Sequence, residues 1–173
     1  MNCKSCDNIN HFYQMKEDTS LSSFNCYKPK EKYYIATNNI QMPCSTGCQT
    51  CSGPSSLSST NCLTCDTANY YYPLATDASN CIAKGIDLYY LYLDTMYPCA
   101  VECKTCSGND TSSKCLTCDT SSKYYPVDSS TSLSCLLYPV DKYYLINNKL
   151  YPCHSNCKTC TESGTASNTK CIK

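Results

Sequence analysis

Cysteine pairs of the form Cys-x-x-Cys are the residues of this chain with the clearest chemical potential. The two complete sets are Cys48, Cys51, Cys62 and Cys65, and then Cys103, Cys106, Cys115 and Cys118. Four thiolates at this spacing are typical of a structural zinc site, whereas in an oxidising compartment the same cysteines form disulfides. A zinc site would leave two further regularly spaced cysteines in each repeat without a role. The sequence therefore favours disulfides, and we expect no metal site and no cofactor.

Other chemistries have less support. The chain has two histidines, His11 and His154, so a cysteine–histidine catalytic pair cannot recur with the repeats. A single site with His154 stays open, but an exposed loop histidine beside Cys153 is the simpler interpretation. Asp66 and Asp119 each follow a Cys-x-x-Cys pair and offer too few oxygens for calcium, so an Asx turn is the favoured role. We expect no catalytic residues and no enzymatic activity.

The cysteines recur as a tandem array. The complete sets are Cys44, Cys48, Cys51, Cys62, Cys65 and Cys81, and Cys99, Cys103, Cys106, Cys115, Cys118 and Cys135. The partial sets are Cys3, Cys6 and Cys26, and Cys153, Cys157, Cys160 and Cys171. Successive first cysteines lie 55 and 54 positions apart, as in a repeat protein. We divide the chain into the C-terminal part of a repeat (1–26), two complete repeats (27–81 and 82–135) and the N-terminal part of another (136–173).

Each first cysteine is preceded by a linker of 17 residues that predicts a β-hairpin. Two aromatic or aliphatic runs flank Asn38-Asn39, Asp94-Thr95 or Asn147-Asn148, and Asn and Asp tolerate the positive φ of tight turns. A proline directly before the cysteine would close the second strand. No amphipathic helix is evident. We predict a small disulfide-rich fold, mostly irregular with short β-hairpins, whose repeats stack into an elongated rod.

The composition indicates that disulfides replace a large apolar core. Cysteine makes up 19 of 173 residues, above the roughly 8–10% that marks a disulfide scaffold, while Leu, Ile, Val and Phe together number 25. Lys+Arg and Asp+Glu are both 14, a balance that suggests neither nucleic acid nor an anionic membrane as partner. This cysteine density implies an extracellular or cell-surface location. Neither a signal peptide nor a membrane span is visible, and because both ends cut a repeat we expect a window on a longer array.

Residues 48–65 and 152–160 resemble furin-like repeats, the cysteine-rich modules of growth-factor receptors. The Tyr-Tyr-Pro clusters at 70–73 and 124–126, together with the Ser/Thr-rich loops, are further similar to repetitive cysteine-rich surface proteins of ciliates and other protists. Spacing alone does not choose among the 15 pairings of six cysteines. The resemblance implies that the first cysteine pairs with the third, the second with the fourth, and the fifth with the sixth. The implied pairs are Cys44–Cys51, Cys48–Cys62, Cys65–Cys81, Cys99–Cys106, Cys103–Cys115, Cys118–Cys135, Cys153–Cys160, Cys157–Cys171 and Cys6–Cys26.

Three further expectations concern partners. Cys3 is left over and is expected to be unpaired in this chain or linked outside it. Asn109 stands in the only N-glycosylation sequon, and the Ser/Thr runs are candidates for O-glycans. In each tyrosine cluster we expect one ring to pack against the disulfides and the other to face outward, which would make a stripe suited to self-association.

These observations predict a non-enzymatic, extracellular structural repeat protein, a building block of a cell-surface coat, appendage or filament. Its expected partners are further copies or further repeats of the same kind, with no nucleic acid and no direct membrane insertion. The alternative is a stalk or ligand-binding segment of a receptor or adhesin. That alternative would show one repeat with a distinctive exposed patch, and the three linkers are too alike to show one.

Overall fold

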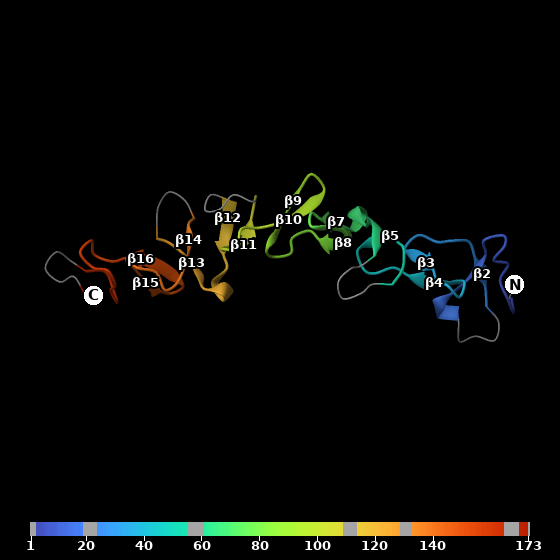
Figure 1. Cartoon of the computed structure of the whole chain (residues 1–173), viewed down its shortest axis with the longest axis horizontal. Coiled ribbons are helices and arrows are strands. Elements are labelled where there is room, and N and C mark those ends of the chain that lie inside the picture. The colour runs from blue at the N-terminus through green and yellow to red at the C-terminus, as the bar shows by residue number, and fades with distance from the viewer. Residues whose placement is uncertain are drawn as a thin grey trace. The chain divides into compact units, whose positions relative to one another are not determined.

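The computed structural model describes residues 3–18, 24–54, 61–108, 114–128, 133–164 and 170–172. Within these ranges the chain forms sixteen short strands and three single-turn 3-10 helices. Figure 1 shows short strands and turns alternating along the chain, with almost no helix. The expectation of a small disulfide-rich fold with short hairpins and without an amphipathic helix is confirmed.

The bounds of the elements follow the cysteine pattern. The strands are β1 (Tyr13–Met15), β2 (Cys26–Tyr27), β3 (Tyr33–Ile35), β4 (Ile40–Pro43), β5 (Cys48–Cys51), β6 (Cys62–Cys65), β7 (Tyr71–Leu74), β8 (Asp77–Ala83), β9 (Tyr89–Tyr92), β10 (Thr95–Pro98), β11 (Cys103–Cys106), β12 (Cys115–Cys118), β13 (Tyr124–Pro126), β14 (Cys135–Leu137), β15 (Tyr143–Ile146) and β16 (Lys149–Pro152). The 3-10 turns are η1 (Lys16–Asp18), η2 (Thr67–Asn69) and η3 (Thr120–Ser122).

The chain divides into two compact units. The first comprises residues 1–84 and 93–96, and the second comprises residues 85–92 and 97–173. The finer division at 1–26, 27–81, 82–135 and 136–173 follows the cysteine pattern of the sequence and stays a prediction.

The linker hairpins form where the sequence predicts them. β3 pairs antiparallel with β4, and β15 with β16, and β4, β10 and β16 each end at the proline before a cysteine. Asn147 and Asn148 both have positive φ, so they make the tight turn expected of them.

The turn of the second linker is one residue earlier than predicted. β9 ends at Tyr92 and β10 begins at Thr95, so Leu93 and Asp94 are the turn residues rather than Asp94 and Thr95. Both have positive φ, 44° and 55°. Leu is disfavoured at positive φ, which is why residue preference alone misplaced this turn.

Disulfide sulfurs, rather than aliphatic side chains, form the core. Among the described residues, cysteines are eleven of the sixteen buried apolar side chains. One buried cluster gathers around Cys48 and Cys62, another around Cys103 and Cys115, and a third around Cys157.

The second tyrosine of each linker pair packs on these clusters. Tyr34, Tyr90 and Tyr144 each contact the cystines of their own repeat. Tyr90 and Tyr144 also stack on a tyrosine of the second run, Tyr97 and Tyr151, with ring centroids 5.8 and 5.7 Å apart. These rings therefore act as the apolar cover of a thin core.

Candidate functional site

The disulfides are the most regular chemical feature of the chain. Nine pairs form, and they coincide with the nine that the furin-like resemblance implies: Cys6–Cys26, Cys44–Cys51, Cys48–Cys62, Cys65–Cys81, Cys99–Cys106, Cys103–Cys115, Cys118–Cys135, Cys153–Cys160 and Cys157–Cys171. The cysteines considered for zinc are thus all oxidised. Cys3 is the one free cysteine; it is half-buried, and its backbone exchanges two hydrogen bonds with Phe24.

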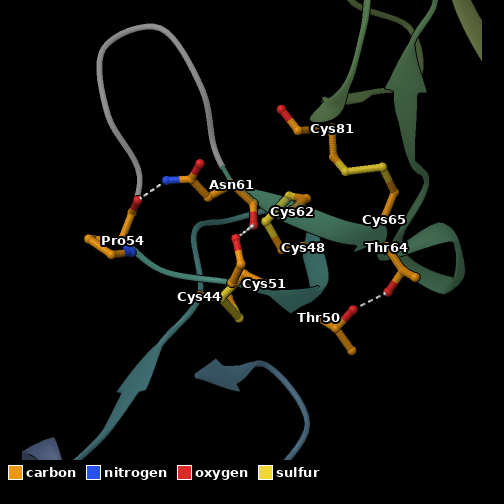
Figure 2. Close-up of a disulfide and its surroundings, with 12 residues drawn as sticks. Cys44, Cys48, Thr50, Cys51, Pro54, Asn61, Cys62, Thr64, Cys65 and Cys81 are labelled. Atoms are coloured by element: carbon orange, nitrogen blue, oxygen red, sulfur yellow. Dashed lines mark hydrogen bonds between the residues drawn. A yellow bond between two sulfur atoms is a disulfide. The ribbon is translucent and has the colours of Figure 1, made fainter. Parts of the chain in front are cut away.

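Figure 2 shows how these bonds are organised in the repeat from 27 to 81. β5 and β6 are the two Cys-x-x-Cys strands and pair antiparallel, and the buried Cys48–Cys62 disulfide joins them. On the exposed side, the hydroxyls of Thr50 and Thr64 are hydrogen-bonded at 2.7 Å. The next repeat has the same bond between Thr105 and Thr117, also at 2.7 Å. Each pair of strands is therefore closed by sulfur on its inner face and by hydroxyls on its outer face.

Successive repeats are joined by parallel strand pairing, which we call the junction. A strand of one repeat pairs with the second strand of the following linker: β1 with β4, and β7 with β10. Near the end of the chain, Val127 forms a parallel bridge to Leu150 in β16. The first two junctions lie within the first compact unit and the third lies within the second unit.

Each junction buries one side chain at the same place, three residues before the first cysteine. Gln41, Met96 and Leu150 are the three residues, and each is 0% exposed. The burial of Gln41 is compatible with its polarity because its amide accepts from the backbone of Lys30 and donates to the carbonyls of Tyr27 and Lys28, at 2.9, 3.2 and 3.1 Å. A buried polar side chain with all these partners costs little.

The aspartates after the Cys-x-x-Cys pairs hold local turns. The Asp7 and Asp119 side chains accept from the backbone N–H three residues later, at 3.2 and 3.4 Å. Asp66 instead binds the Lys32 ammonium at 2.5 Å and the Asn69 amide at 2.8 Å. The hydrogen bond from Lys32 is the main cause that lowers the pKa of Asp66, and hydrogen bonds from Asn10 and Ser121 do the same for Asp7 and Asp119 respectively.

Acid is expected to destabilise the fold through these carboxylates. A carboxyl whose pKa is lower in the folded chain stabilises it above the ordinary pKa, 3.8 for aspartate, and this contribution is lost as the pH falls through the folded value. The melting temperature should therefore be level near neutrality and fall below about pH 4. Thermal scans from pH 7 to pH 2 measure the melting temperature. In Asp66→Asn the melting temperature should fall less at acid pH than it does in the parent. Asp94→Asn is the control, because Asn148 occupies the corresponding turn position. An equal drop in Asp66→Asn and the parent would contradict this role of Asp66.

Both histidines of the chain lie close to a polar group of a neighbouring residue. His11 Nδ1 lies 3.4 Å from the Tyr13 hydroxyl, and His154 Nδ1 accepts from the Asn156 backbone at 3.3 Å. Among the described residues, no group of three or more His, Cys, Asp or Glu side chains forms a possible metal site. No helix in the described ranges is long and apolar enough to span a membrane. Asn109 lies outside the described residues.

A recurring exposed aliphatic side chain escaped the sequence reasoning. Leu63, Leu116 and Ile172 each follow the fourth cysteine of their repeat, and they are 67%, 62% and 62% exposed. The sequence did contain a signal for this feature. When the repeats are aligned, an aliphatic residue recurs directly after the fourth cysteine, at a position where one face of a two-stranded hairpin must be exposed to solvent.

In the Tyr-Tyr-Pro cluster after β6, Tyr71 packs on the cystines of its repeat while Tyr70 is 65% exposed. In the next cluster Tyr124 packs on the cystines and Tyr125 is half-buried.

A comparison of the chain with protein-family models, curated proteins and solved structures finds no match. The content of nine disulfides is typical of an extracellular or secreted protein.

Proposed function

We propose that this chain is an extracellular structural repeat protein, a non-enzymatic array of furin-like repeats that builds a cell-surface coat, appendage or filament. The observation that carries the proposal is the junction. At each junction a repeat pairs a strand with the following linker and buries one side chain there. Repeats that contact their sequence neighbours in this way extend into rods.

The interior supports a structural role. Cystine clusters fill the space that an aliphatic core would take in a larger domain, and small extracellular modules use disulfides in this way. Such a core tolerates long exposure outside the cell, because the cross-links restrict the unfolded chain.

The exposed aliphatic residues provide a contact for self-association. An aliphatic residue stands directly after the fourth cysteine in three of the four repeats, as Leu63, Leu116 and Ile172, so each of these repeats offers an apolar contact to another copy. Several weak contacts that form at once strengthen the binding between two copies. Head-to-tail contacts that do not close into a ring give open fibres.

The experiment compares the oxidised chain with the double variant Leu63→Ser and Leu116→Ser. Analytical ultracentrifugation over a range of concentrations and negative-stain microscopy should show elongated particles that associate in the parent and much less in the variant. Leu137→Ser is the control, because Leu137 is also exposed but does not follow a fourth cysteine. Compact monomers of the parent at all concentrations would contradict the structural proposal.

A further inference from the structure

The buried aspartates of the two complete repeats occupy equivalent places. Asp66 and Asp119 each follow the second Cys-x-x-Cys pair of their repeat, and they are 6% and 8% exposed. The Asp66 N–H donates to the Gly47 carbonyl and the Asp119 N–H to the Glu102 carbonyl, at 2.8 and 2.9 Å. Because the backbone seats are the same, the side-chain contacts of the two carboxylates can be compared directly.

In the repeat from 27 to 81 the carboxylate has a cation from its own chain. Lys32 stands directly before β3, and its ammonium lies 2.5 Å from Asp66 Oδ2. The position of Lys32 is taken by Leu88 in the repeat from 82 to 135, directly before β9. Both residues have positive φ, 63° and 70°, and the carbonyl of each accepts from the N–H of the next cysteine at 2.8 Å. The backbone is therefore alike in the two repeats, and the positive charge is missing from the second.

Asp119 has no cation in the place of Lys32. The Ser121 hydroxyl and the Ser122 N–H both donate to Asp119 Oδ1, and none of the ion pairs between described residues includes this carboxylate. The hydrogen bond from Ser121 is the main cause that lowers the pKa of Asp119, so the group is charged at neutral pH. A largely buried charge is unfavourable unless a partner of opposite charge compensates it.

The second oxygen of this carboxylate is open to solvent. No described residue donates a hydrogen bond to Asp119 Oδ2. Among the described residues, Ser45 Oγ is the one buried side-chain oxygen or nitrogen that lacks a partner, so Oδ2, which lacks one as well, is accessible. A ligand can therefore reach the charge that the protein leaves without a counter-ion.

A small surface cavity of about 110 Å³ gives access to Asp119. It is lined by Asp87, Leu88, Lys104, Asp119 and Ser121. All five residues belong to the second compact unit. Sites for whole small molecules measure about 300–1,000 Å³, so this cavity suits a single functional group.

The lysine on the cavity wall is engaged with another carboxylate. The Lys104 ammonium lies 3.5 Å from Asp87, and Lys158 pairs with Asp141 at the same distance and the corresponding position of the repeat from 136 to 173. The pair is thus a contact of the linker rather than a partner for Asp119. Because Lys104 and Asp87 offset each other, the cavity carries one net negative charge, and a cationic group is attracted to it.

The lining fits a primary ammonium group. The carboxylates of Asp119 and Asp87 and the hydroxyl oxygen of Ser121 are three acceptors on the wall, and an ammonium has three N–H donors. Leu88 is 47% exposed and provides an apolar wall for the methylene stem of a lysine. Two carboxylates are too few for a calcium site.

We propose that the cavity beside Asp119 binds the ammonium group of a lysine side chain from another molecule. The incoming group takes the place that Lys32 fills in the repeat from 27 to 81, where the equivalent carboxylate already binds an ammonium within the chain. This inference goes beyond the structural role and does not rest on it, because the array could form with or without an occupied cavity.

NMR titration of the oxidised, isotope-labelled chain with Nα-acetyl-lysine methylamide, called the lysine amide below, tests the site. The amide signals of Ser121 and Ser122 should shift and saturate as the lysine amide is added. The same compound acetylated at Nε should cause no shift, because it has no charge. Sodium chloride at equal ionic strength should cause none either, because the sodium ion has no N–H donors.

Leu88→Lys is the variant that separates this site from a general effect of charge. The new ammonium can pair with Asp119 as Lys32 pairs with Asp66, so the variant should bind the lysine amide at least tenfold more weakly, which is about 1.4 kcal/mol. The variant is expected to fold, because the other two linkers have lysine at this position with the same backbone conformation.

Leu137→Lys is the charge-matched control. Leu137 is 52% exposed and does not line the cavity, so this variant should bind the lysine amide as the parent does. Absence of any shift at Ser121 and Ser122 would overturn the proposal, and so would a shift that sodium chloride reproduces or equal binding by Leu88→Lys.

Analytical ultracentrifugation distinguishes the sources of the lysine. If the lysine amide and Leu88→Lys both weaken self-association of the chain, the lysine belongs to a second copy. If neither changes self-association while the lysine amide still binds to the parent, the lysine belongs to a different protein. Both results support the site. A parent that binds the lysine amide but stays a compact monomer would contradict the structural proposal alone.

Discussion

Reduction of the nine disulfides should unfold the chain at room temperature without denaturant. Cysteines are eleven of the sixteen buried apolar side chains among the described residues, so little core remains once the bridges are open. Each bridge contributes about 2–4 kcal/mol, and nine contributions of that order exceed the roughly 5–15 kcal/mol net stability of ordinary domains. Dithiothreitol should therefore collapse the amide dispersion of the NMR spectrum and the β signal in circular dichroism.

Two controls define this experiment. The chelator EDTA should leave the spectra unchanged, whereas a chain held by zinc thiolates would unfold. Alkylation with iodoacetamide should label one cysteine, Cys3, before reduction under denaturing conditions and all 19 after it. A fully reduced chain that keeps its dispersed spectrum would mean that backbone pairing and tyrosine packing suffice, and it would refute the view of the core as cystine.

The class of fold could be predicted from the sequence because its causes are local. Asn147 and Asn148 prefer the turn they form, proline ends each second strand, and cysteine density indicates cross-links in place of a core. The turn at Leu93 and Asp94 could not be read from residue preference. Alignment with Asn147 and Asn148 would have placed it, because these linkers are equal in length.

The junctions were beyond local reasoning because they pair strands across a repeat boundary. Gln41 conceals the pattern further, since a glutamine at a buried position does not read as a core residue. Its burial depends on the carbonyls of Tyr27 and Lys28, and such partners appear only in three dimensions.

Leu150→Ala should loosen the junction between the repeats 82–135 and 136–173. Leu150 is 0% exposed, and truncation of a buried leucine costs about 2–5 kcal/mol. The Asp128–Lys149 ion pair beside it, at 2.6 Å, is nearly half exposed and should contribute less than about 1 kcal/mol. Hydrophobic burial, rather than the ion pair, is thus expected to hold this junction.

Native-state hydrogen exchange measures the stability of this junction at the Asp128 amide, which donates to the Leu150 carbonyl at 2.8 Å. Protection there should fall about 100-fold in Leu150→Ala, since each tenfold step is about 1.4 kcal/mol, and less than tenfold in Lys149→Met. The Ala75 amide, bonded to Met96 at the preceding junction, should keep its protection and serves as an internal control. Unchanged protection of Asp128 in Leu150→Ala would show that the buried side chain does not couple the repeats, and the structural proposal would lose the observation on which it rests.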